Sequence, residues 1–132
     1  MWFRRKKKNL DHAALAATPC DADLSGHWLA WDVTNAASRV LSGVNLEQHG
    51  TAVLGRMQCK FAAAPLTIRG IVCDQRLIAN FWRPDDYLMG SGMFDLVVDP
   101  ESETIEGTSK WYNTETGECY EQNWQWERDP AE

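Results

Sequence analysis

The sequence predicts an all-β protein, folded as a single eight-stranded antiparallel up-and-down barrel. From Ser25 onward, apolar and polar residues alternate with the period of two that is typical of β-strands. Turn-forming residues interrupt this alternation at short intervals, and no helical pattern separates the strands to cover parallel pairs. The chain has 132 residues, of which 44% are hydrophobic, so it suits one domain with a buried core.

A basic segment, residues 1–24, precedes the predicted barrel domain of residues 25–129. Residues 9–19 are its helix-like part, so the segment is expected to be flexible or to form a short helix with no place in the barrel. Five cations give the first eight residues a charge of +5. Residues 2–8 are therefore candidates for peripheral contact with an anionic membrane, at about 1 kcal/mol per cation. The alternative is a solvated, frayed terminus.

A polar connection and a tight turn separate the first three predicted strands. Residues 26–34 (GHWLAWDVT) form the first, and a polar connection leads to the second, 43–49 (VNLEQH after Gly43). His49-Gly50 predicts a hairpin turn into the third strand, 52–60 (AVLGRMQCK), which again has one apolar face.

The next two strands form a second hairpin. Residues 66–73 (LTIRGIVC) carry aliphatic side chains at alternate positions, and Asp74-Gln75 turns the chain into 76–83 (RLIANFWR). Loop 84–92 follows, with a proline at its start and two glycines.

Of the last three strands, the final two differ from the others because their predicted inward faces carry polar as well as aromatic residues. The first of the three is 93–98 (MFDLVV), which is followed by the turn DPESE. The second is 104–112 (TIEGTSKWY), which is followed by the turn NTETGE. The last is 118–128 (ECYEQNWQWER), which ends the domain.

Glycines in three strands favour a closed barrel. Gly55, Gly70 and Gly107 lie inside predicted strands, where glycine weakens a flat sheet but permits the sharp coiling that barrel closure needs. A two-sheet sandwich built from the same strands is the alternative. A barrel of about eight strands has room inside for side chains or for one small ligand.

The first and last strands resemble those of the calycin barrels, which include lipocalins, fatty-acid-binding proteins and avidins. The chain has Gly26-His27-Trp28 at the start of the first strand and Arg128 at the end of the last. In calycins a Gly-x-Trp opens the first strand, and an arginine near the chain end packs over the tryptophan to close the barrel floor. The resemblance therefore implies a Trp28–Arg128 contact, worth about 0.5–2 kcal/mol as a cation–π pair.

A second resemblance is to the β-barrel sensor of bacterial anti-phage effectors that respond to cyclic oligonucleotides. Those barrels also open with Gly-x-Trp and continue with Leu-x-Gln-x-Gly, which Leu46-Glu47-Gln48-His49-Gly50 matches. They follow membrane helices, whereas no apolar run in this chain reaches the roughly 20 residues of a membrane span. This resemblance implies a bacterial signalling or defence sensor.

The apolar faces of the strands predict the inner wall of the barrel. Its predicted residues are Leu46, Val53, Met57, Ile68, Val72, Leu77, Phe81, Phe94, Leu96 and Ile105. Aromatic side chains with a few polar groups among them are typical of a ligand cavity, in which Trp111 and Trp124 offer faces for a flat ring. The candidate ligand-binding residues are Gln48, Arg83, Ser109, Trp111, Tyr120, Gln122 and Trp124. Arg83 is expected at the mouth, beside loop 84–92. Bulky side chains that fill the interior completely are the alternative.

Charge and motifs exclude several other functions. Residues 9–132 carry a net charge of −11, which argues against general binding of nucleic acids. No nucleophile elbow, phosphate loop or zinc-protease motif occurs, and only a chance convergence such as Asp32 with His49 would supply an acid–base pair. The four cysteines are widely spaced without a CxxC pair, so reduced thiols are expected, and a metal cluster of Cys20, Asp21, Asp23 and His27 is not.

These observations predict a non-enzymatic barrel that binds a small, partly aromatic molecule, with a nucleotide as one candidate, and that needs no cofactor. A filled barrel that docks a protein partner through its acidic surface or loop 84–92 is the alternative, and a small barrel enzyme is the third. A cytoplasmic location is expected, with peripheral membrane contact left open.

Overall fold

A computed structural model describes residues 22–35, 37–59, 64–84 and 91–131 of the chain. In this structure eight strands form one closed barrel, in which each strand pairs antiparallel with the next and the last pairs with the first. This confirms the predicted all-β, up-and-down barrel and excludes the two-sheet sandwich. The helix-like stretch 9–19 and residues 2–8 lie outside the described residues, as does most of loop 84–92.

The strands follow the predicted alternation closely. They are β1 (Gly26–Asp32), β2 (Val40–His49), β3 (Ala52–Cys59), β4 (Leu66–Cys73), β5 (Arg76–Trp82), β6 (Gly92–Val98), β7 (Thr104–Tyr112) and β8 (Cys119–Arg128).

The largest differences from the predicted boundaries, of two and three residues, lie around the connection between β1 and β2, and the other strand ends differ by at most one residue. β1 ends at Asp32 because its carboxylate accepts hydrogen bonds from the backbone N–H and the hydroxyl of Thr34, which turns the chain out of the strand. β2 begins three residues early, at Val40, because Val40 lies opposite Asp32 and extends the β1–β2 ladder.

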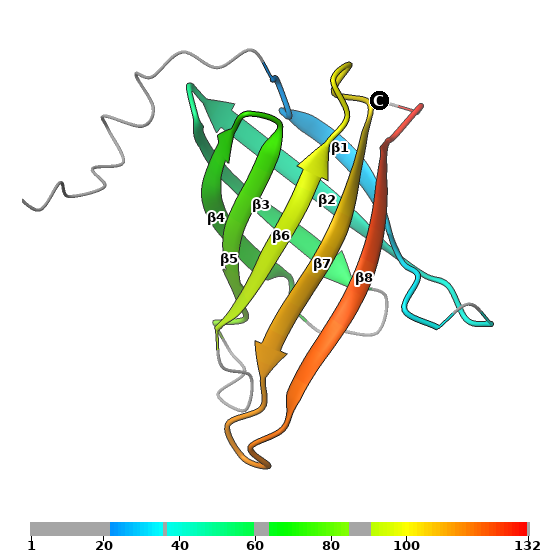
Figure 1. Ribbon diagram of the computed structural model, residues 1–132, viewed down its shortest axis with the longest axis vertical. Coiled ribbons are helices and arrows are strands. Elements are labelled where there is room, and N and C mark those ends of the chain that lie inside the picture. Colours follow the sequence, from blue (N-terminus) through cyan, green and yellow to red (C-terminus); the bar gives the residue numbers. More distant parts are fainter. Residues whose placement is uncertain (1–21, 36, 60–63, 85–90, 132) are drawn as a thin grey trace, which may run out of the picture.

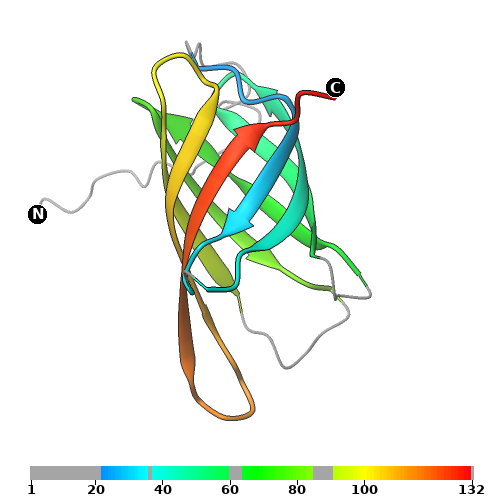
Figure 2. The ribbon, with the colours of Figure 1, turned by 90° about the vertical axis from the view of Figure 1, so that its right-hand side faces the viewer.

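The barrel closes through the pairing of β1 with β8 (Figure 2). Trp28 of β1 lies opposite Val44 of β2 on one side and opposite Arg128 of β8 on the other. The first and last strands, more than 90 residues apart in sequence, are therefore neighbours in the same wall.

The inner face is the one that the alternation predicts. All ten residues predicted to form the inner wall are at most 3% exposed. The side chains of Trp28, Trp124 and Trp126 are also buried in this interior. The interior is thus a continuous apolar core to which every strand contributes.

Glycines lie where neighbouring strands come too close for a side chain. A Cβ at Gly70 of β4 would collide with the carbonyl oxygen of Ile78 on β5, and one at Gly107 of β7 would collide with that of Asp95 on β6. These close approaches are what the coiling of a small barrel requires.

The two ends of the barrel differ (Figure 1). We call the end that holds residues 22–25 and the β2–β3, β4–β5 and β6–β7 turns the closed end, and the other the open end. At the open end the β7–β8 hairpin extends past the rest of the barrel (Figures 1 and 2), because β7 and β8 stay paired as far as Tyr112 and Cys119, beyond the last partners of their other neighbours.

Candidate functional site

Side chains of β1 and β8 form hydrogen bonds with the backbone of residues 22–25, which crosses the closed end. The guanidinium of Arg128 lies 4.5 Å from the centre of the Trp28 ring, which confirms the expected cation–π contact. Arg128 also donates hydrogen bonds to the carbonyl oxygens of Asp23 and Ser25. The indole N–H of Trp28 donates to the carbonyl oxygen of Leu24 at 2.9 Å. This end is therefore closed by the chain itself.

Gln48, one of the candidate ligand-binding residues, belongs to this closure. Its amide oxygen accepts from the backbone N–H of Leu24 at 2.7 Å. Its amide nitrogen donates to the carbonyl oxygens of Ala22 and Gly50, at 2.7 and 2.8 Å. Gln48 thus bonds to the backbone at the end opposite the other candidates.

A cavity of about 190 Å³ lies inside the open half of the barrel. Its apolar wall comes from six strands, β3 to β8, and consists of Met57, Leu66, Phe81, Phe94, Trp111 and Trp124. Cys59, Arg83 and Gln122 also line it. The cavity therefore brings together four of the seven candidate residues, and a fifth, Ser109, is hydrogen-bonded to two of them.

The aromatic rings of the wall pack against neighbouring rings in tilted, edge-to-face and stacked arrangements, which hold them in place. The Phe94 ring lies 4.5 Å from Phe81 at 41°, and 5.9 Å from Trp124 at 74°, measured between ring centres and planes. Trp111 is stacked on Tyr120 at 4.6 Å and 24°. A flat ligand would therefore meet rings that are already held by neighbours.

Tyr120 shares the inward face of β8, as predicted, yet it is 38% exposed because its part of the hairpin extends past the barrel. It supports Trp111 from outside the cavity. The negative charge of Glu118 raises the pKa of the Tyr120 hydroxyl above its usual value.

A chain of hydrogen bonds runs along the cavity wall. The indole N–H of Trp124 donates to Ser109 Oγ at 2.8 Å, and the Ser109 hydroxyl donates to Gln122 Oε1 at 3.2 Å. Gln122 Nε2 donates to Asp32 Oδ2 at 2.9 Å. Asp32 Oδ1 is held by the Thr34 hydroxyl. Sequence reasoning missed Asp32 in this role, because 90 residues separate it from Gln122.

Arg83, the residue directly after β5, lines the cavity with its Nε buried. Its guanidinium is the one formal charge among the side chains of the cavity wall in the described part of the chain. The expected partnership with loop 84–92 is not tested, since residues 85–90 lie outside the described ranges.

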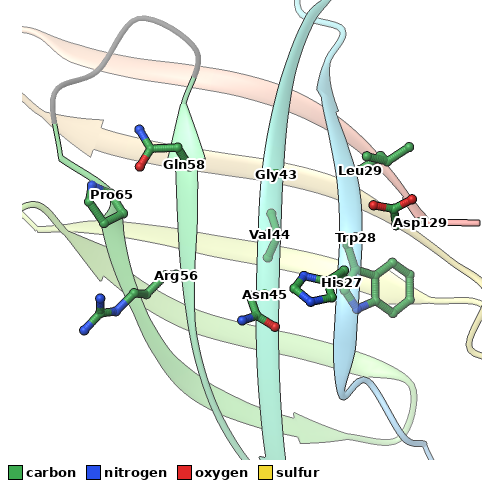
Figure 3. Close-up of a pocket in the computed structure, with 10 residues that line it drawn as sticks. All are labelled: His27, Trp28, Leu29, Gly43, Val44, Asn45, Arg56, Gln58, Pro65 and Asp129. Carbon is green, nitrogen blue, oxygen red and sulfur yellow. The ribbon is translucent and has the colours of Figure 1, made fainter. Parts of the chain in front are cut away.

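Hollows on the outer wall are larger but one-sided. One of about 330 Å³ spreads over β1–β3 and Pro65, above Gly43, where an added Cβ would meet nothing within 4 Å (Figure 3). In this view the side chains of Arg56, Gln58 and Leu29 are spread around the hollow and do not converge on one point. A ligand there would contact a single sheet surface, whereas the inner cavity surrounds its contents with apolar walls and a few polar groups, as ligand sites usually do.

Catalytic and metal chemistry finds little support in the described residues. Asp32 and His49, the acid–base pair considered from the sequence, lie at opposite ends of the barrel, and the His49 ring contacts Glu47 at 2.8 Å. Within residues 22–131, apart from the gaps given above, no group of three His, Cys, Asp or Glu side chains is placed to hold a metal ion. Cys20 and Asp21 lie outside the described residues. In the same part of the chain, no helix has the length and apolarity needed to cross a membrane.

Because comparison with known proteins assigns no family, a function for this chain has to be proposed from its fold and its cavity. No protein-family model and no curated protein matches this chain. A closed eight-stranded antiparallel barrel is consistent with the calycin fold and is not specific to it, because one architecture can serve many unrelated functions. What the comparisons and the fold together establish is an eight-stranded up-and-down β-barrel without a family assignment.

Proposed function

We propose that this barrel binds a small molecule with a flat ring in the cavity at its open end, without catalysing a reaction on it. The observation that carries this proposal is the 190 Å³ cavity, which is lined mainly by aromatic and aliphatic side chains and contains a few polar groups. The core is otherwise packed, with twelve of its large side chains less than 2% exposed. A space among such close-packed side chains costs stability, so its retention favours a ligand.

The size of the cavity limits the ligand. An apolar cavity of about 150 Å³ holds benzene, whereas sites for drug-sized molecules measure roughly 300–1,000 Å³. The 190 Å³ cavity therefore suits one ring with small substituents. A nucleotide, the candidate from the sequence, would place its base in the cavity and its sugar and phosphate outside, with Arg83 as the nearest cation of the wall.

A calycin-like, lipocalin-like mode of binding fits this proposal. The contact of Arg128 with Trp28 closes one end of the barrel, in the manner that the resemblance implied. Ligand entry is then restricted to the other end. A sensor in bacterial signalling or defence, located in the cytoplasm, is the corresponding cellular role.

The test is a titration with single-ring compounds, followed by tryptophan fluorescence and calorimetry. The intact protein is expected to bind at least some of them, and Trp124→Ala is expected to lose the response. Cys59→Phe places a ring in the cavity and should abolish binding, whereas Cys73→Phe, on the exposed face of β4, should leave it unchanged. Absence of any binding at millimolar ligand would refute the proposal, and so would equal binding by the two phenylalanine variants.

A protein-interaction module is the second candidate, because β6 presents two large apolar side chains to solvent. Met93 is 49% exposed and Val97 is 58% exposed on its outer face. Affinity capture with the intact chain would be compared with Met93→Glu/Val97→Glu and with a variant of loop 84–92. A partner whose capture depends on neither change would exclude both surfaces.

The basic segment joins the barrel at the end opposite the cavity, because Ala22 and Leu24 are tied at the closed end. We therefore propose that membrane contact through residues 2–8 would leave the cavity mouth accessible. Sedimentation with anionic liposomes should decrease when residues 1–8 are removed, and ring binding should not change. Equal sedimentation of both forms would exclude the membrane contact.

A further inference from the structure

The hydrogen-bond chain beside the cavity fixes the orientation of the Gln122 amide. Trp124 can only donate through its indole N–H, and the carboxylate of Asp32 can only accept. The bonds through Ser109 therefore run in one direction, so the carbonyl of Gln122 points toward Ser109 and its NH₂ group points toward Asp32. A reversed amide would place its NH₂ group against the Ser109 hydroxyl and its oxygen against a carboxylate, which is repulsive.

Gln122 retains hydrogen-bonding capacity on both of its polar atoms. A glutamine amide has two N–H donors and two acceptor positions. Among the described residues, one N–H is bonded to Asp32 and one acceptor position to Ser109. The half-buried side chain lines the cavity, so the second N–H and the second acceptor position are available to its contents. Buried amide groups that lack partners are costly, so this site favours a ligand that satisfies both.

The position of Trp124 sets the plane in which that ligand would lie. Gln122 and Trp124 are two residues apart on β8 and face the same side, roughly 7 Å apart along the strand. Trp124 is only 6% exposed, and its bond to Ser109 fixes its ring. A ring packed against Trp124 would therefore have an edge within reach of the oriented amide.

We infer that the ligand is a single ring that carries a lactam or a cyclic imide, whose adjacent N–H and C=O pair with the oriented amide of Gln122 while the ring packs against Trp124. This inference rests on the proposed function and names the chemical class of its ligand. Two antiparallel hydrogen bonds between amide groups satisfy both partners. A ring without the N–H/C=O pair would leave the remaining groups of Gln122 unsatisfied, and sites that hydrogen-bond their ligand discriminate strongly against such analogues.

The test compares dissociation constants of four single-ring probes: 2-pyridone, phenol, benzene and benzoate. The intact protein is expected to bind 2-pyridone about tenfold or more tightly than phenol or benzene. Gln122→Met keeps the length of the side chain and removes the amide, so the preference should fall to about twofold or less while benzene still binds. Retained benzene binding distinguishes loss of the amide from loss of the fold. Gln125→Met, on the exposed outer face of β8, is the matched control and should keep the preference.

Asp32→Asn tests the orientation directly. An asparagine at this position can donate as well as accept, so the Gln122 amide is no longer held in one orientation and the preference for 2-pyridone should decrease. Equal affinity of the intact protein for 2-pyridone, phenol and benzene would overturn the inference and leave the proposed function standing. A preference that persists in Gln122→Met, or a stronger preference for benzoate, would also overturn it. Failure of all four probes to bind would refute the proposed function itself.

Discussion

The closed end and the open end of the barrel use polar side chains in opposite ways. At the closed end, Arg128, Trp28 and Gln48 bond to the backbone of residues 22–25, and the amide of Gln48 makes two such bonds and a third to the carbonyl oxygen of Gly50. At the open end, Gln122 is oriented by two side chains and keeps a donor and an acceptor for the cavity. One amide therefore bonds to the backbone that closes the barrel, and the other is the one that we propose recognises a ligand.

The largest difference between the two ends should appear when a tryptophan is removed from each. Trp28→Ala removes a side chain that is 1% exposed, its hydrogen bond to Leu24 and its contact with Arg128. We expect the free energy of unfolding in urea to fall by about 3–5 kcal/mol. Trp111→Ala, in the half-buried cavity wall, should cost less than about 2 kcal/mol and should abolish ring binding. Equal losses of stability would contradict the distinction between the ends.

Glycine substitutions separate the inside of the wall from the outside. Gly70→Ala forces a methyl group against the backbone of β5 and should lower the free energy of unfolding by about 2–3 kcal/mol. Gly43→Ala places the same methyl group in open space on the outer wall, so it should be neutral or should stabilise by up to about 1 kcal/mol. Thermal melts of the two variants measure the contrast. Similar melting temperatures would show that the strands do not approach as closely as described.

The two glutamines test the comparison in a matched pair. Gln48→Met removes three hydrogen bonds to the backbone and should lower the free energy of unfolding by about 1–2 kcal/mol without affecting ring binding. Gln122→Met should have the smaller effect on stability and the larger effect on binding. Urea denaturation and calorimetric titration of both variants provide the check, and a Gln48 variant with altered ring affinity would contradict the assignment.

The smallest effect is expected for the ion pair between Arg76 and Asp95, which is exposed on the outer wall and is part of neither polar network. Two hydrogen bonds from Arg76, at 2.8 and 2.7 Å, lower the pKa of the Asp95 carboxyl below its ordinary value of 3.8. A carboxyl whose pKa is lower in the folded state stabilises that state above pH 3.8, and the contribution is lost as the pH falls through the lowered pKa. In acid titrations followed by circular dichroism, the intact protein should therefore lose slightly more stability than Asp95→Asn. Parallel acid curves would show that the pair contributes nothing.

Alternation predicted the barrel because the side-chain period of a strand is a local property. Leu77 and Phe81, for example, are predicted to face inward because they lie at alternate positions of β5, and both are buried in the structure. Local pattern also placed Gln48 and Tyr120 on inward faces, but it could not tell which end the chain closes or how far a hairpin extends. Those features depend on register between strands, which alternation alone does not specify.

The cavity was predictable in composition and not in detail. An aromatic wall with Gln122 and Ser109 follows from the inward faces of β7 and β8. The role of Asp32 depends on the pairing of the first strand with the last, which places Asp32 opposite Trp124. No local pattern in the sequence predicts the hydrogen bond between Gln122 and Asp32.

The most direct test of a ligand cavity at the open end is an NMR titration that follows the indole ¹H–¹⁵N signals of the seven tryptophans with 2-pyridone or benzene. The signals of Trp111 and Trp124 should shift on addition of ligand, and that of Trp28, packed at the closed end, should not. Unchanged signals for Trp111 and Trp124 at millimolar ligand, or an equal shift at Trp28, would contradict the account.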